Sequence, residues 1–355
     1  MLSKHHYAIE LAQENQVYFL NPSKPHFKKI TLEKHDSIKN IIIINYTSWV
    51  KGLTILPPWL SDILAWLDIQ RISKLTKNTF DVVWNFDMYR YQNAKLFHAK
   101  ISILHSVDFT NTSLELRSAR YYNIIFSVSH EILEKFKQNN NNAFFINHGV
   151  SQYFLQPMSN NSEASHKRVA CGYVGNLLSF AIHHENLIRI VSSNTNVDFH
   201  FIGPYTNSNL GMYEPNEQFL EQLSSFPNVV LHGSLPAEKV AVKIQEYDMF
   251  LICYHPEKVG KVVSNNHKVI EYLSTGKVVV SSRTSTYETL AAGLFEMVTD
   301  SDDLPKKFSD VVSNIGAYNT NDLVKKRKAF AFENSYSNQI QRIEQLVTRL
   351  MESKN

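Results

Sequence analysis

Short apolar runs rich in β-branched residues alternate with helix-period segments along the whole chain, and this alternation restricts the fold more than any other feature. Strands separated by helices are typical of parallel sheets built from β-α units. In the first half we expect strands at 16–20, 41–46, 82–86, 100–105, 124–128 and 143–146. In the second half we expect strands at 169–174, 198–202, 229–231, 249–253, 277–281 and 296–298. The sequence therefore predicts an α/β protein with two doubly wound, Rossmann-like domains.

The length of 355 residues agrees with two domains, because a single hydrophobic core rarely grows beyond roughly 250–300 residues. The stretch 156–168 is polar, contains Pro and Ser, has no hydrophobic period, and is predicted to be the linker. We expect an N-terminal domain over 1–155, a C-terminal domain over 169–320 and a helical segment over 321–355 that packs across both. The chain starts with a helical segment, so an opening strand and its glycine-containing loop are expected to be missing. Open parallel sheets bind ligands at the carboxyl ends of their strands, so the two domains are expected to face a central ligand cleft.

Composition and charge exclude several classes of protein. Hydrophobic residues make up 43% of the chain, enough for a large core. Cys171 and Cys253 both lie in apolar runs, which favours buried thiols over a disulfide. We therefore expect a reducing compartment. No apolar run approaches the roughly 18 residues that cross a bilayer, so we expect a cytoplasmic protein, with peripheral membrane contact as an alternative. The net charge of +3 is too small and dispersed for a nucleic-acid surface.

One amphipathic segment and two basic stretches have open interpretations. An apolar stripe lies between two predicted strands and comprises Trp59, Leu60, Ile63, Leu64, Trp66 and Leu67. Core packing of a crossover helix is the favoured interpretation, and contact with a membrane or a lipid acceptor is the alternative. A loose basic stretch nearby is interpreted as a solvated face, with contact to anionic lipid as the alternative; it comprises Lys24, Lys28, Lys29 and Lys34. The run Lys325–Lys328 is predicted to lie on the exposed side of the last helix.

Three segments resemble the GT-B glycosyltransferases, specifically the retaining nucleotide-sugar enzymes related to glycosyltransferase family four. The first is INHGVS at 146–151, followed by Tyr153 and Phe154. The second is GYVGN at 172–176, paired with FIGP at 201–204 on the next predicted strand. The third is HKVIEYLSTGKVVV at 267–280, which is similar to the donor-binding segment of that family.

The resemblance implies transfer of a sugar from a UDP- or GDP-type donor to a glycan or lipid-linked acceptor, with retention and with no cofactor besides the donor. It implies that the C-terminal domain binds the donor through Gly175, Asn176, Gly203, Pro204, Asn266, His267, Lys268 and Glu271. A helix beginning near Asn266 is expected to face the diphosphate, with Lys268 adding a positive charge there. Glu271 is expected to accept hydrogen bonds from the ribose hydroxyls, which requires its ionised form. A solvated helix residue is the other interpretation of Glu271.

Two residues are implied in catalysis. They are Lys268 and His105, which ends the predicted strand at 100–105 and would face the donor sugar. A structural histidine is the alternative for His105. No metal-ligand spacing is present, and the adjacent pairs His5-His6 and His183-His184 cannot both face one site from a regular helix, so a metal-free mechanism is predicted.

The chain departs from the family pattern in two places, and these departures keep a non-catalytic homologue open. The family has an earlier glutamate where this chain has Val263, and an Arg and a Lys where it has 176–180, NLLSF. Charge compensation is then expected from Lys258, Lys261, Lys268 and Arg283. The alternatives are a GT-B-fold nucleotide-sugar epimerase and a non-catalytic homologue that acts as a binding partner.

Overall fold

The computed structural model describes residues 3–24, 29–48, 55–77, 79–87, 89–107, 113–156, 168–206, 216–255 and 265–353. The chain divides into two compact units, unit 1 with Met1–His148 and Tyr336–Asn355, and unit 2 with Gly149–Ser335. Residues 149–155, expected in the N-terminal domain, belong to unit 2 because Val150 and Phe154 are buried in the core of that unit. Most of the predicted linker, 157–167, lies outside the described residues.

The described strands of unit 1 form two sheets. In the first, with order β1-β3-β2, β1 (Val17–Leu20) is parallel and β2 (Thr31–Lys34) antiparallel to β3 (Ile41–Asn45). The second is parallel and follows the order β4 (Val82–Asn85), β5 (Ile101–Ser106), β6 (Ile124–Ser127), β7 (Ala143–Phe145). The sequence patterns predicted all of these strands except β2, which is exposed at every position and therefore carries no apolar run.

Helices cover the second sheet of unit 1. Those of the unit are α1 (Ser3–Leu11), α2 (Pro58–Thr76), α3 (Ser113–Ser118), α4 (His130–Lys137) and α15 (Tyr336–Glu352), with short 3-10 turns at Ala94–Phe97 and Ala119–Tyr121. Tyr7 of α1 and Ile340 and Ile343 of α15 share one buried cluster with Ile103 and Phe126 of the sheet. The first and last helices of the described chain therefore complete the same core.

The stripe on α2 was predicted to pack in the core, and this prediction is wrong for Trp59, Ile63 and Trp66, which are exposed. The buried residues of α2 are instead Ser61, Ala65, Asp68, Ile69, Ile72 and Thr76. Asp68 accepts hydrogen bonds from the side chains of Ser48 and Arg71, and the bond from Ser48 joins this buried face to the segment after β3.

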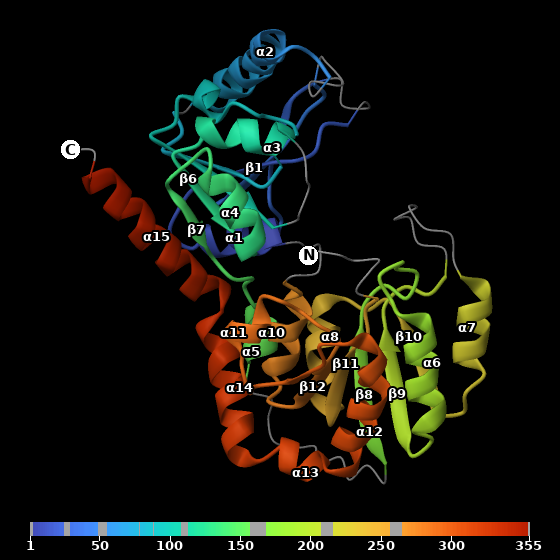
Figure 1. Cartoon of the computed structure of the whole chain (residues 1–355). Coiled ribbons are helices and arrows are strands. Elements are labelled where there is room, and N and C mark those ends of the chain that lie inside the picture. Colours follow the sequence, from blue (N-terminus) through green and yellow to red (C-terminus); the bar gives the residue numbers. More distant parts are fainter. Residues whose placement is uncertain are drawn as a thin grey trace. The chain divides into compact units, whose positions relative to one another are not determined.

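Unit 2 contains a parallel sheet with helices on both faces (Figure 1). Its strand order is β10 (Val229–Gly233), β9 (Val197–Ile202), β8 (Val169–Val174), β11 (Met249–Ile252), β12 (Val278–Ser281), β13 (Glu296–Met297). Its helices are α5 (Gln152–Leu155), α6 (His184–Ser193), α7 (Glu217–Ser224), α8 (Ala237–Lys243), α10 (His267–Leu273), α11 (Tyr287–Leu290), α12 (Leu304–Ser313), α13 (Ile315–Tyr318) and α14 (Asn321–Glu333), with 3-10 turns at Ile244–Glu246 and Ser301–Asp303. Each predicted strand agrees with an observed one to within two residues at either end.

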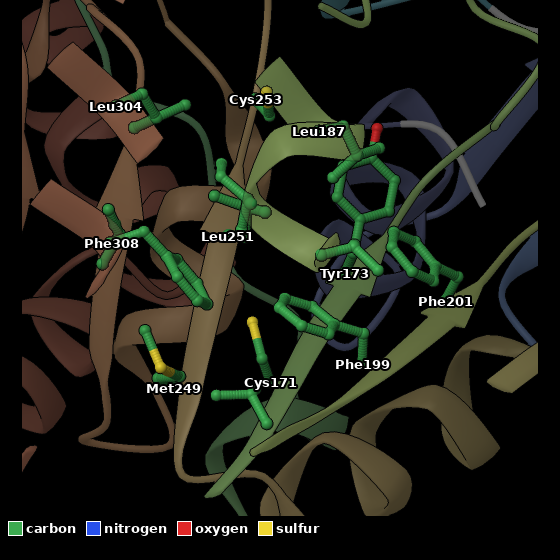
Figure 2. Packing of buried hydrophobic residues seen from close by; sticks show 14 of the residues in the cluster. Cys171, Tyr173, Leu187, Phe199, Phe201, Met249, Leu251, Cys253, Leu304 and Phe308 are labelled. Atoms are coloured by element: carbon green, nitrogen blue, oxygen red, sulfur yellow. The ribbon is translucent and has the colours of Figure 1, made fainter. Parts of the chain in front are cut away.

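Two hydrophobic clusters lie on opposite faces of this sheet. Figure 2 shows the one in which Phe199, Leu251 and Phe308 pack together. Cys171 and Cys253 are buried in the same cluster and are not bonded to each other, which confirms the prediction of buried thiols. Strands buried on both faces explain why the second half reads as continuous apolar runs.

The break predicted near residues 334–336 is present between α14 and α15, and the boundary between the units passes through it. One residue of the run predicted to be exposed is an exception: Arg327 is 1% exposed. Its guanidinium donates to the carbonyls of Leu294 and Gly276 and to the side chain of Asn319. Within the described residues, no helix is both long and apolar enough to span a bilayer.

Candidate functional site

Two glycines follow neighbouring strands at the same edge of the unit 2 sheet. Gly175 comes directly after β8 and Gly203 directly after β9, and the last residues of these strands are paired. The N–H of Gly175 donates to the carbonyl of Ile202 at 2.8 Å. A Cβ on Gly203 would lie 1.9 Å from the carbonyl oxygen of Gly175, and the φ of Gly203 is +147°. Position 203 therefore accepts only glycine, because any side chain would overlap the neighbouring backbone.

The loop after β8 is held by its own hydrogen bonds. The carbonyl of Pro204 accepts from the N–H of Leu177 at 3.0 Å, and Oδ1 of Asn176 accepts from the N–H of Leu178 at 2.9 Å. These bonds fix the backbone of both predicted segments beside β8, whose neighbours β9 and β11 lie on its two sides. The strand order of the sheet reverses between β8 and β11, and open α/β sheets bind ligands at such a point.

The ammonium group of Lys268 lies over Gly175. A Cβ on Gly175 would be only 2.5 Å from Nζ of Lys268. Nζ donates to the hydroxyl of Tyr254 at 3.2 Å and lies 6.0 Å from the ring centre of Tyr173. A positive charge is thus held at the carboxyl ends of β8 and β11, against backbone that carries no side chain.

Helix α10 is fastened to the sheet by Tyr272. The hydroxyl of Tyr272 accepts from the N–H of Val174 at 2.7 Å, and its ring stacks on Phe250 with centroids 4.3 Å apart. Lys268 precedes Tyr272 by four residues and lies on the same side of the helix. The contact of Tyr272 with β8 therefore determines where the lysine side chain starts.

The first residues of α10 agree in part with the prediction. Oδ1 of Asn266 accepts from the N–H of Lys268 at 3.1 Å, which caps the helix as expected. Nδ2 of Asn266 is buried and has no hydrogen-bond partner in the part of the chain that the structure describes. His267 is exposed at the start of the helix.

Glu271 lies three residues after Lys268 and is partly buried. Burial raises the pKa of its carboxyl to about 7, and the nearby Lys268 opposes this shift. Near neutral pH both protonation states are therefore populated. The partial burial disagrees with a fully solvated residue, while the role of Glu271 in binding ribose stays a prediction.

Of the remaining charge candidates, the structure describes Arg283 alone. Arg283 is paired with Glu288, whose Oε1 lies 2.6 Å from its Nε. Lys258, Lys261 and Val263 lie outside the described residues. Among the residues that the structure describes, no group of three or more His, Cys, Asp or Glu side chains is arranged to hold a metal ion. The metal-free mechanism stays a prediction.

His105 lies in unit 1, on β5, and its side chain is fully buried. The imidazole stacks on Trp84 and Phe86, with centroids 5.9 and 5.1 Å away, and contacts Tyr7 at 5.1 Å. Neither ring nitrogen has a hydrogen-bond partner within the described ranges. Burial, with a smaller effect of His148, lowers the pKa of His105 to about 3. These surroundings favour the structural alternative, and the catalytic role of His105 stays a prediction.

Sequence reasoning missed the tyrosines of the site. Tyr254 and Tyr173 contact Lys268 and Tyr272 fastens its helix to β8, yet none was singled out. Tyr254 comes two residues after β11, and this position at a carboxyl strand end was the available signal. Tyr272 lies four residues after Lys268, a spacing that also indicates a shared face.

Comparison with protein-family models found no match, and comparison with curated protein sequences found none either. Solved structures do match over nearly the whole chain. Sucrose-phosphate synthase from Thermosynechococcus elongatus matches with a TM-score of 0.69 and 10% identity, covering 99% of this chain and 93% of that one. The Anabaena protein HepE, in complex with UDP and glucose, matches with a TM-score of 0.67 and 13% identity, covering 98% and 96%.

A third match has the same architecture. It is an α,α-trehalose-phosphate synthase (UDP-forming) from Burkholderia xenovorans in complex with glucose-6-phosphate, with a TM-score of 0.68, 11% identity and coverage of 98% and 95%. At such identities the likeness establishes the fold. The chain has the GT-B fold of two Rossmann-like domains, as the sequence predicted.

Proposed function

We propose that this protein is a glycosyltransferase that moves a sugar from a nucleotide-diphosphate donor to a glycan or lipid-linked acceptor, with retention and without a metal ion. One observation carries the proposal: the ammonium of Lys268 lies over Gly175, at the point where Gly203 brings two strand ends into close backbone contact. Such a place favours an anion that needs both a positive charge and room against the backbone.

The chemistry of the described residues suits a diphosphate leaving group. When the bond between sugar and diphosphate breaks, negative charge grows on the diphosphate oxygens. A fixed ammonium stabilises that charge more in the transition state than in the ground state. Tyr254 holds Nζ of Lys268 in place, and a carboxylate at Glu271 accepts hydrogen bonds from the ribose hydroxyls.

UDP is the first donor nucleotide to test. The Anabaena protein is recorded with UDP and glucose, and the Burkholderia synthase is UDP-forming. That synthase was solved with glucose-6-phosphate, so sugar phosphates belong in the acceptor panel beside glycans and lipid-linked sugars.

The experiment is calorimetric titration of the full chain with UDP and GDP, followed by transfer assays with the corresponding sugar donors. Lys268→Met should weaken nucleotide binding by about tenfold or more, the size of a lost charge-assisted hydrogen bond. Lys239→Met, which removes an exposed lysine of α8, is the matched control and should change binding less than about twofold.

Two results would overturn the proposal. If the folded protein binds neither nucleotide, unit 2 is not a donor site. If it binds a nucleotide but transfers no sugar to any acceptor and releases none to water, the protein is a non-catalytic homologue.

A further inference from the structure

We infer that α2 docks unit 1 on a membrane surface that contains anionic lipids. The helix lies at the periphery of unit 1 (Figure 1) and carries large apolar side chains that remain in solvent. Trp59 is 66% exposed, Ile63 50% and Trp66 41%. Ile55, just before the helix, is 87% exposed.

The exposed residues form one stripe. Trp59, Ile63 and Trp66 are spaced by four and three residues, so they lie on one side of the helix. The opposite side, with Ala65 and Ile69, belongs to a buried cluster with Tyr46 and Tyr91. One face of α2 thus packs on its own unit, and a second, apolar face remains exposed to solvent.

The charges along the exposed face point to the occupant. Beyond Trp66 the same side continues to Lys74, and Lys77 ends the helix; both lysines are exposed. The two acidic residues of α2 make contacts within unit 1: Asp68 is buried, and Asp62 accepts a hydrogen bond from Asn93 at 2.9 Å. The exposed face is therefore apolar at one end and positive at the other.

Tryptophan and lysine side chains together suit a membrane interface. Indole rings prefer the boundary between headgroups and acyl chains, and lysines gain energy from anionic headgroups at the same depth. This combination of side chains favours a lipid bilayer over a second copy of the chain as the partner of the exposed face. The inference does not depend on the proposed reaction, because docking is measured without donor or acceptor.

The test is flotation of the full chain with vesicles of phosphatidylcholine alone and of phosphatidylcholine containing about one third phosphatidylglycerol. We expect binding to the anionic vesicles and much weaker binding to the neutral ones. The double variant Trp59→Ala/Trp66→Ala should bind the anionic vesicles at least about tenfold more weakly. Lys74→Gln/Lys77→Asn should also lose about tenfold.

The control is Val242→Ser, which removes an exposed apolar side chain from α8 of unit 2 and should bind as the unmodified chain does. A second measurement does not need a variant to fold. Brominated lipid in the anionic vesicles should quench the tryptophan emission of the unmodified chain, since α2 carries two of its four tryptophans.

The inference is overturned if the unmodified chain neither floats with anionic vesicles nor shows quenching. It is also overturned if the tryptophan variant binds as well as Val242→Ser. Sedimentation that shows a dimer of the unmodified chain and a monomer of the tryptophan variant, without vesicle binding, would assign the stripe to a second copy.

Discussion

The fully buried His105 should make unit 1 sensitive to acid, and His105→Phe should remove that sensitivity. Burial lowers the pKa of His105 to about 3, against an ordinary value of 6.5. Below pH 6.5 the unfolded chain therefore takes up a proton that the folded chain does not. Stability from the neutral imidazole is complete above pH 6.5 and is lost as the pH falls from 6.5 towards 3.

The size of the loss follows from this shift. Each pH unit below 6.5 costs about 1.4 kcal/mol in the free energy of unfolding, as long as the folded imidazole stays neutral. At pH 5 the cost from His105 alone is about 2 kcal/mol. Phenylalanine cannot take up a proton, and it suits a site lined by Trp84 and Phe86. Between neutral pH and pH 5, the free energy of unfolding of the variant should therefore fall by about 2 kcal/mol less than that of the unmodified chain.

Urea unfolding followed by tryptophan fluorescence measures this difference, because all four tryptophans lie in unit 1. The experiment compares both proteins at about pH 7.5 and pH 5. His130→Phe, at an exposed histidine stacked on Phe145, is the control and should keep the pH dependence of the unmodified chain. Equal losses in the unmodified chain and in His105→Phe would refute the reasoning. The same variant tests the predicted catalytic role, which requires that transfer activity falls although the fold is kept.

Three further predictions concern the site of unit 2. Gly203→Ala should destabilise the unit by about 2–4 kcal/mol and abolish nucleotide binding, since its Cβ would overlap the Gly175 carbonyl; an unchanged melting temperature would contradict this. Tyr254→Phe removes the acceptor for Lys268, and calorimetry should show nucleotide affinity falling by about tenfold. Unchanged affinity would show that Tyr254 only packs against its neighbours. Because the pKa of Glu271 is about 7, nucleotide affinity should rise by up to about tenfold from pH 6 to pH 8, a gain that Glu271→Gln should not show. Parallel pH profiles for the two proteins would argue against the ribose contact.

The sequence by itself determined the elements of unit 2 and the spacing of its motifs. Strands buried on both faces, such as β8 and β11, leave uninterrupted apolar runs in the sequence, so their positions can be predicted. The break before α15 and the cap at Asn266 are also local patterns. Each depends on residues that are close together in the chain.

Only the tertiary structure decided which residues meet across the chain. The overlap that restricts Gly203 to glycine involves Gly175, which lies 28 residues earlier and follows another strand. Tyr254 became part of the site because the side chain of Lys268 reaches back to it from α10. Arg327 looked like one cation in an exposed basic run, but its guanidinium donates to the distant carbonyls of Leu294 and Gly276 and to the side chain of Asn319. Hydrogen bonds of this kind leave no periodic signal.

The helix α2 shows the same limit from the opposite side. Its apolar stripe predicted a buried face, because amphipathic spacing shows that large apolar residues share one side of a helix. Spacing does not show which side meets the core. In this fold Ala65 and Ile69 pack with Tyr46 and Tyr91 on the other face, where Ser48 also bonds Asp68, and Trp59 and Trp66 are left in solvent. The sequence determined that the stripe exists, and the packing of the rest of unit 1 decided that it is exposed.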